Sequence, residues 1–257
     1  MTLTDSSRQV APPALASDVT AVILAGGQGT RIRALFPDVP KPLIPVAGQP
    51  FLNWLTGYLA GAGLRSFVYS TGYKGSQIDD WCRDGGFPDC RRISVYEGQP
   101  LGTGGGLLNC LDDAADWLLV ANGDGLCMTG IDALLAMRHE PGVDGGLIGV
   151  HVADTSPYGS LDSDEAGMLL RFREKQPGTG YVNSGIYLFR KSALEPLRRQ
   201  EPSSLERDLI PEMLAAGRRL KVVRCAEAPF IDIGTPEAIA RADDFVMTHL
   251  AHLRPRV

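Results

Sequence analysis

Short strand-like runs alternate with helix-like stretches along most of this 257-residue chain, and no other feature constrains the fold as strongly. Runs rich in β-branched or aromatic residues are expected to form strands, with amphipathic helices between them. Such alternation favours right-handed crossovers and a mainly parallel sheet covered on both faces. We therefore predict an α/β fold with ligands at the carboxyl ends of the strands. The expected strands are 19–24, 66–70, 93–97, 117–121 and 146–152, and the expected helices are 51–62, 76–83, 105–115 and 131–139.

The second half of the chain has a less regular pattern. Residues 158–175 alternate around a polar stretch at 162–167, which indicates a hairpin, and a further strand is expected over 181–190. Two helices are then expected. They span 204–216, with Ser204 as N-cap, and 236–250, with Thr235 as N-cap and Pro236 at the first helical position.

Length and composition fit a single domain. A hydrophobic content of 44% in 257 residues is enough for one sizeable core. Residues 1–18 are rich in Ser, Ala and Pro and contain no apolar run like that of a signal peptide, so we expect a disordered tail there. The domain is predicted over 19–253.

The charge and the cysteine usage exclude several classes of function. The formal net charge of −5 argues against nucleic acid or an anionic membrane as the main partner. No run approaches the roughly 18 to 20 apolar residues that a membrane-spanning helix needs. The five cysteines form no C-x-x-C pair, which argues against a zinc ribbon or a disulfide scaffold and favours a cytoplasmic location.

A glycine-rich turn follows the first expected strand. It reads Ala25-Gly-Gly-Gln-Gly-Thr-Arg31, and its missing Cβ atoms would let backbone N–H groups approach an anion such as phosphate. The turn matches neither a Walker loop nor the G-x-G-x-x-G dinucleotide motif. The alternative interpretation is a tight strand-to-helix connection with no ligand.

Lys41 stands between two prolines downstream of this turn. Pro40 and Pro42 are expected to hold the backbone extended and to fix the direction of the lysine, which suits a point charge aimed at a phosphate. The alternative is a solvated loop lysine.

Two aspartates are candidates for a metal site. Asp124 follows the expected strand 117–121, and Asp232 lies in a second strand-like run that ends near a helix cap. Two carboxylates together with phosphate oxygens and waters would give Mg²⁺ its preferred octahedral oxygen shell. An aspartate before a helix is otherwise a cap or a turn residue.

Three motifs together resemble the signature of the sugar-1-phosphate nucleotidyltransferases: Leu24-Ala-Gly-Gly-Gln-Gly-Thr-Arg31, Pro40-Lys-Pro-Leu-Ile-Pro-Val46 and Gly48-Gln-Pro-Phe-Leu52. The resemblance implies a Rossmann-like doubly wound sheet with a hairpin-decorated sugar-binding half. It also implies transfer of a nucleotide from a nucleoside triphosphate to a sugar 1-phosphate, with release of pyrophosphate. Arg31 would then grip the phosphates, and Lys41 would stabilise the reacting one. The residues implied to cradle the nucleotide are Leu24, Ala25, Gly26, Gly27, Gly29 and Thr30.

The same resemblance assigns the base and sugar contacts. The loop that begins at Glu97 would read the base, with Gly102 and Thr103 as further contacts; alternatively, this loop simply requires positive φ angles. A carboxylate acceptor suits sugar hydroxyls and a lysine suits the sugar phosphate. The implied sugar-binding residues are Gly159, Glu174, Lys175 and Asn183, of which the pair at 174–175 is otherwise a surface ion pair on a hairpin.

The sequence departs from the commoner family pattern in three places. Gly125 follows Asp124 where a small hydroxyl residue is frequent, and Phe230-Ile231 stand where a tryptophan is often found. Gln176 replaces a proline that often follows the lysine. None of these changes removes an expected ligand.

Five segments carry a finer resemblance within the family, at 36–42, 50–52, 100–105, 204–209 and 230–234. In these segments the chain resembles the short D-glycero-D-manno-heptose 1-phosphate guanylyltransferases most. This implies GTP and a heptose 1-phosphate as substrates and Mg²⁺ as cofactor. The alternatives are another hexose 1-phosphate or a cyclitol phosphate with UTP, dTTP or CTP, or a non-catalytic sensor of nucleotide or sugar phosphate. The oligomeric state stays open, because Phe245, Val246 and Leu250 could close either the core or a dimer interface.

Overall fold

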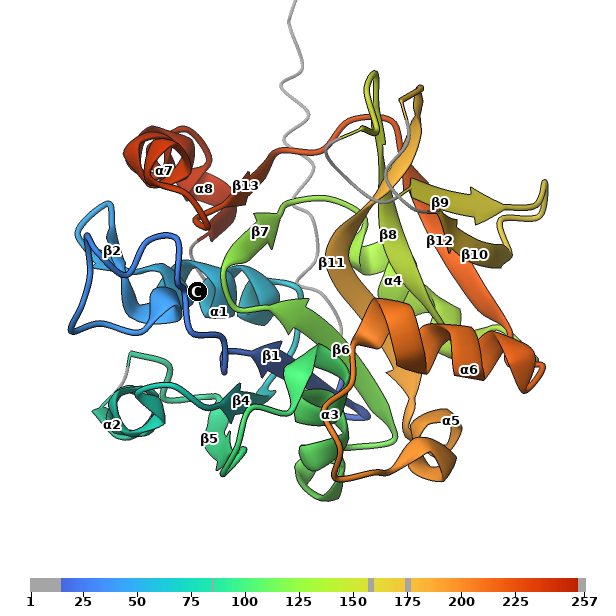
Figure 1. The fold of residues 1–257 in the computed structure, drawn as a ribbon, viewed down its shortest axis with the longest axis horizontal. Helices are drawn as coiled ribbons and strands as arrows, with labels where there is room; N and C mark the ends of the chain where they lie inside the picture. The colour runs from blue at the N-terminus through green and yellow to red at the C-terminus, as the bar shows by residue number, and fades with distance from the viewer. Residues whose placement is uncertain (1–14, 85, 157–159, 174–176, 254–257) are drawn as a thin grey trace, which may run out of the picture.

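The computed structural model describes residues 15–84, 86–156, 160–173 and 177–253, and its centre is a nine-stranded sheet (Figure 1). Seven strands follow the order β10-β9-β11-β6-β1-β4-β5, while β8 pairs with β11 and β12 pairs with β8. Two further two-stranded ribbons are formed by β7 with β13 and by β2 with β3. The strands are β1 Val19–Leu24, β2 Pro45–Val46, β3 Gln49–Pro50, β4 Ser66–Thr71, β5 Arg91–Tyr96, β6 Trp117–Asn122, β7 Gly125–Cys127, β8 Gly145–Val152, β9 Ser160–Ser163, β10 Leu169–Arg173, β11 Gly180–Arg190, β12 Leu220–Cys225 and β13 Phe230–Asp232.

The helices lie on both faces of this sheet. The α-helices are α1 Phe51–Gly61, α2 Gly75–Asp84, α3 Gly102–Asn109, α4 Ile131–Ala136, α5 Lys191–Leu194, α6 Ile210–Ala215, α7 Pro236–Thr248 and α8 Leu250–Leu253. Short 3₁₀ turns occur at Lys41–Leu43, Leu111–Asp113, Met137–His139 and Glu195–Leu197, and a π-helical turn at Leu205–Leu209 precedes α6.

The first half of the chain forms one parallel part of the sheet, and the pairing of β8 with β12 in the second half is parallel as well. Strand β1 lies between β4 and β6, and both pairings are parallel. Strand β11 then runs antiparallel to β6, and the β9–β10 hairpin extends the sheet beyond it. The predicted α/β fold with a mainly parallel sheet and a hairpin in its second half is confirmed, and Figure 1 shows the two halves side by side.

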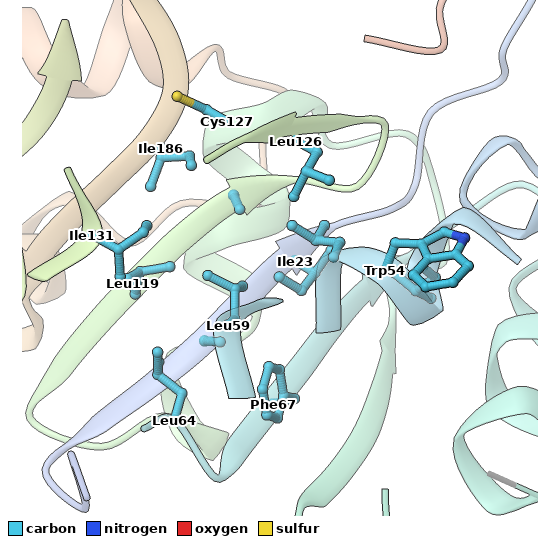
Figure 2. Close-up of a cluster of buried hydrophobic side chains, with 14 of the residues drawn as sticks. Ile23, Trp54, Leu59, Leu64, Phe67, Leu119, Leu126, Cys127, Ile131 and Ile186 are labelled. Atoms are coloured by element: carbon cyan, nitrogen blue, oxygen red, sulfur yellow. The ribbon is translucent and has the colours of Figure 1, made fainter. Parts of the chain in front are cut away.

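Alternate residues of the central strands pack on opposite faces, as the two-residue period of a strand requires. Ala21 and Ile23 of β1 belong to a core cluster that includes side chains of α1, α2, α4 and α7, part of which Figure 2 shows. Val22 belongs to the second cluster, with side chains of α3, α5 and α6. Because both faces are covered, the open edge formed by the strand ends is left for a ligand.

Two predicted helices have different boundaries in the structure. The helix predicted over 105–115 begins earlier, at Gly102, because Ser203 O accepts hydrogen bonds from Gly104 N (2.8 Å) and Gly105 N (3.4 Å). The helix predicted over 204–216 begins with a π-helical turn, although Ser204 is its N-cap as predicted. The start of α3 thus depends on a distant segment, whereas the local cap at Ser204 was found from the sequence.

Packing begins before residue 19 and continues to the end of the described chain. Ala16 is buried and its N–H donates to Gly63 O (3.2 Å), so ordered contacts start within the segment predicted as a tail. Val246 is buried in the core, with Phe245 and Leu250 packed against it. These three side chains therefore close the core of this chain. In the part that the structure describes, no helix is both long and apolar enough to cross a membrane, and all five cysteines are free thiols.

Candidate active site

A cavity of about 330 Å³ opens at the carboxyl ends of β1 and β6. Seven of the predicted nucleotide contacts line this cavity: Leu24, Ala25, Gly26, Gly27, Glu97, Gly102 and Thr103. Lys41 and Asp124 line it as well. The sequence analysis gave no role to its other lining residues, which are Gln28, Pro42, Pro100, Asn122 and Gly123.

The first glycine-rich turn is shaped by close contacts of the protein with itself. A Cβ at Gly26 would overlap the Glu97 carboxylate, whereas a Cβ at Gly27 would meet no atom within 4 Å. Gly29 has a φ of +57°, a value that favours glycine, and lies beside the Lys41 side chain. The turn therefore needs glycine at Gly26 and Gly29 even without a ligand.

Glu97 is held firmly at the wall of the cavity. Its Oε1 accepts a hydrogen bond from Ser70 Oγ (2.9 Å), and its Oε2 accepts one from Leu101 N (3.1 Å). A Cβ at Gly106 would lie 2.9 Å from Oε1, so α3 can pack beside the carboxylate only with glycine at that position. Each carboxylate oxygen can still accept a further hydrogen bond.

The second glycine-rich turn is tied to the segment before α6. Gly102 has a φ of +71°, and a Cβ there would lie 2.5 Å from Ser203 O. Thr103 Oγ1 accepts a hydrogen bond from Leu205 N (2.9 Å). Both residues line the cavity, and both also have a structural role that fits the alternative interpretation of this loop.

Four charged side chains gather at one end of the cavity. Lys41 Nζ forms an ion pair with Asp124 Oδ2 and lies 3.5 Å from Asp232 Oδ1. A Cβ at Gly234 would lie 2.9 Å from Lys41 Nζ and 3.4 Å from Arg31 Nη2, so the Arg31 guanidinium belongs to the same cluster. The Lys41 side chain is 11% exposed, against 31% for Asp124 and 49% for Asp232, so the carboxylates keep faces open to solvent.

The ribbon of β7 and β13 brings the two aspartates together. Gly125 pairs with Asp232, and Ile233 N donates a hydrogen bond to Asp124 O (2.9 Å). Figure 1 shows the two short strands side by side. The sequence analysis expected both aspartates at one site but did not predict this pairing.

The backbone at Lys41 differs from the prediction. Lys41 does not lie in extended backbone; it begins the 3₁₀ turn Lys41–Leu43, with Pro40 as the extended residue before it. Proline is tolerated near a helix start because its missing N–H would have no partner there. The prolines thus still fix the direction of Lys41, through a turn.

The carboxylates of Asp124 and Asp232 suit a divalent cation that also binds the substrate. The two positive charges of Arg31 and Lys41 equal the two negative charges of Asp124 and Asp232. A triphosphate adds several negative charges, which a divalent cation would help to neutralise. No group of three or more His, Cys, Asp or Glu side chains placed for a metal occurs among the residues described. Mg²⁺ typically binds one or two carboxylates and completes its shell with phosphate oxygens and waters, and the two aspartates fit that pattern.

Asn183 lies at a bulge in β11, the strand that pairs with β6, and does not itself line the cavity. Ile186 of β11 pairs with Ala121 of β6, so Gly185 lies next to Asn122, a residue that lines the cavity. Asn183 therefore lies beyond the end of β6. Asn183 Nδ2 donates to Tyr187 Oη (2.6 Å), and its Oδ1 accepts from Gly185 N (3.0 Å). The other predicted sugar contacts, Gly159, Glu174 and Lys175, lie outside the described residues.

Cys127 follows Asp124 by three residues on β7. Cys127 is buried on β7, and burial raises the pKa of its thiol to about 11. The thiol therefore stays protonated. This leaves binding and charge stabilisation as the chemistry of the described cluster.

Residues 20–249 match the model of the nucleotidyl transferase family. The chain belongs to this family. It is 35% identical over 227 residues to the mannose-1-phosphate guanylyltransferase of Mycobacterium tuberculosis, covering 87% of this chain and 63% of that protein. It is 32% identical over 219 residues to the D-glycero-alpha-D-manno-heptose 1-phosphate guanylyltransferase of Campylobacter jejuni, covering 84% of this chain and 95% of that protein.

A solved structure supports the same family assignment. HddC from Yersinia pseudotuberculosis, solved in complex with GMP-PN, is 34% identical with a TM-score of 0.74 and covers 88% of this chain and 98% of its own. The nucleotidyl transferase family predicted from the glycine-rich turn and the Lys41 motif is therefore confirmed. This chain spans less than two thirds of the mycobacterial relative but nearly all of HddC.

Gly26 and Gly27 provide a matched test of the first turn. We expect Gly26→Ala to lower the free energy of unfolding by about 1 to 3 kcal/mol, because its methyl group overlaps the held Glu97 carboxylate. Gly27→Ala, with open space at the same atom, should change it by less than about 0.5 kcal/mol. Urea unfolding of both variants measures the difference, and equal stabilities would contradict this account of the turn.

Proposed function

We propose that this nucleotidyl transferase moves a guanylyl group from GTP to a sugar 1-phosphate and releases pyrophosphate. The observation that carries the proposal is the cluster of Lys41, Asp124, Asp232 and Arg31 at one end of the glycine-lined cavity. The nucleotide would occupy the cavity, with its phosphates towards this cluster. Gly29 and Thr30 complete the proposed nucleotide cradle.

The proposed reaction is an in-line displacement. An oxygen of the sugar phosphate attacks the α-phosphorus of GTP, the bond to the bridging oxygen breaks, and pyrophosphate leaves. The attacking phosphate is already ionised near neutral pH, so the step needs no general base. Lys41 and Arg31 would hold and neutralise the phosphates, which makes positioning and charge stabilisation the main contributions of the protein.

The two aspartates are proposed to hold Mg²⁺. When bound there, the cation would supply positive charge to the triphosphate and orient its oxygens. Asp124 lies between β6 and β7 and Asp232 ends β13, and the pairing of β7 with β13 holds the backbone of the two aspartates together.

Glu97 is proposed to read the base. Its carboxylate only accepts hydrogen bonds, and guanine offers N1–H and N2–H donors along one edge. Adenine would present its N1 acceptor to the same carboxylate and would be repelled. The Ser70 and Leu101 hydrogen bonds hold the carboxylate in place for this recognition.

The sugar is proposed to bind on the β11 side of the cluster. Asn183 and Gly159 would contact the ring, Glu174 would accept hydrogen bonds from hydroxyls, and Lys175 would bind the sugar phosphate. The favoured acceptor is D-glycero-D-manno-heptose 1-phosphate, because the Campylobacter jejuni relative named for it matches along 95% of its length. Mannose 1-phosphate is the second candidate, since the mycobacterial relative named for it is 35% identical.

Pyrophosphate release by the purified protein with Mg²⁺ tests the substrates. GTP, ATP, CTP, UTP and dTTP would each be combined with heptose, mannose and glucose 1-phosphates. We expect release with GTP, fastest with the heptose phosphate. Release with another pair would contradict the proposed substrates but keep the reaction, and binding of GTP without release from any pair would favour a sensor.

Replacing Lys41 tests the role of the charged cluster. We expect Lys41→Ala to lower kcat/KM by a factor of about a hundred to a thousand, equivalent to roughly 3 to 4 kcal/mol of transition-state stabilisation. Arg31→Ala should have a similar effect. Lys221→Ala, whose ammonium pairs with Glu140 instead, is the matched control. Steady-state kinetics decide, and a Lys41→Ala variant with wild-type kcat/KM would contradict the assignment.

Glu97→Gln tests base recognition separately from catalysis. The amide keeps the shape of the side chain but replaces one acceptor by a donor. We expect the preference for GTP over ATP, measured as the ratio of kcat/KM, to fall by about tenfold or more, the cost of an unpaired buried group. A matching fall in both rates, with the ratio unchanged, would instead assign Glu97 a structural role.

A further inference from the structure

A short segment before α6, residues 203–206, touches the wall of the nucleotide cavity at several points. Ser203 N donates to Leu101 O (2.8 Å), and Ser203 O accepts from Gly104 N (2.8 Å). Leu205 N donates to Thr103 Oγ1 (2.9 Å). We call residues 203–206 the bridging segment, because it contacts the nucleotide wall and its last residue extends from there towards β11.

Glu206, at the end of the bridging segment, reaches β11. Its Oε1 accepts a hydrogen bond from Tyr187 Oη (2.6 Å), and its Oε2 accepts one from Ser204 Oγ (3.1 Å). Tyr187 Oη in turn accepts from Asn183 Nδ2 (2.6 Å). A continuous chain of hydrogen bonds therefore runs from Asn183 through a buried phenol to the bridging segment.

The donors in this chain have a fixed direction. Burial, together with the Glu206 carboxylate, raises the pKa of Tyr187 well above its usual value, so the phenol stays protonated and donates to Glu206. Its oxygen is then free to accept from the Asn183 amide N–H. At the other end of that amide, Oδ1 accepts from Gly185 N (3.0 Å). A flipped amide would lose both hydrogen bonds, so Asn183 has one preferred orientation.

We propose that Glu206 is a positioning residue for the sugar 1-phosphate, acting through Tyr187 on the orientation of Asn183. The inference rests on the proposed function, in which Asn183 contacts the sugar. With its orientation fixed, Asn183 keeps one N–H and one lone pair of Oδ1 for a ligand. Because the bridging segment is also bonded to Gly104 and Thr103, the sugar contact is held in register with the nucleotide wall.

The bridging segment is held by several hydrogen bonds that do not involve Glu206, which makes the proposal testable by substitution of that residue. Ser204 N also donates to Asp208 Oδ2 (2.6 Å), and Ser204 Oγ caps the turn by accepting from Arg207 N (3.2 Å). These bonds, with those of Ser203 and Leu205, hold the bridging segment in variants at Glu206.

Calorimetric titration tests the proposal without requiring turnover. Heptose 1-phosphate and mannose 1-phosphate would be titrated into protein saturated with a non-hydrolysable GTP analogue, and the analogue would be titrated separately. The variants are Tyr187→Phe, Glu206→Ala, Glu206→Gln, Asn183→Ala and the double variant of Asn183→Ala with Tyr187→Phe. Glu212→Gln, on α6 but paired with Arg199, is the control.

We expect Tyr187→Phe and Glu206→Ala to weaken sugar phosphate binding by about five- to tenfold, the factor for one lost hydrogen bond, with nucleotide binding within about twofold. Glu206→Gln keeps an acceptor for Tyr187 and should restore most of the affinity. In the Asn183→Ala background, Tyr187→Phe should have no further effect, since Tyr187 acts through that amide.

Three results would overturn the proposal. Equal weakening of sugar phosphate and nucleotide would mean a structural role alone. Effects of Tyr187→Phe and Asn183→Ala that are additive or absent would remove the link through Asn183 while leaving the proposed guanylyl transfer intact, and unchanged binding by Asn183→Ala would also remove its proposed contact with the sugar. A wild-type protein that binds the nucleotide analogue but neither sugar phosphate would overturn the proposed acceptors together with this role of Glu206.

Discussion

The pairing of the Lys41 ammonium with the Asp124 and Asp232 carboxylates is the interaction on which the site depends. It joins three pieces of chain that come from a 3₁₀ turn, the end of β6 and the short strand β13. Two carboxylates this close would repel each other without a cation between them. A bound triphosphate would compete with the aspartates for the Lys41 ammonium, and a metal cation between the two carboxylates would then take over the neutralisation of their charge.

The glycine-rich turns serve the protein as much as any ligand. Gly26 and Gly106 make room for the Glu97 carboxylate, and Gly102 makes room for Ser203 O. The sequence analysis explained the first turn by the approach of a phosphate, which remains a prediction for Gly27, where a side chain would meet only open space. A glycine-rich motif therefore indicates where backbone comes close, but the partner can be another part of the same chain.

Sequence patterns predicted the central strands and the edge where the cavity lies, because β1, β4 and β6 are each a run of almost entirely buried residues. The position of Asp124 and Asp232 at the ends of two strand-like runs led to the expectation that they share one site. The ribbon that joins them was missed, since β7 and β13 are three residues each and pair across a long stretch of chain. The early start of α3 was missed because it depends on Ser203, about a hundred residues away, whereas the 3₁₀ turn at Lys41 was missed although its hydrogen bonds are local.

The polar chain through Tyr187 shows how the two halves of the molecule are kept in register. The nucleotide wall belongs to α3 and the loop before it, whereas Asn183 belongs to the antiparallel strand β11. Apolar packing alone would allow these elements to slide slightly, because dispersion contacts have little directional preference. Hydrogen bonds have a preferred direction, so the chain from Asn183 through the buried Tyr187 to Glu206 favours one arrangement of these elements. In-line transfer requires both substrates to meet with such accuracy, which a network of this kind can provide.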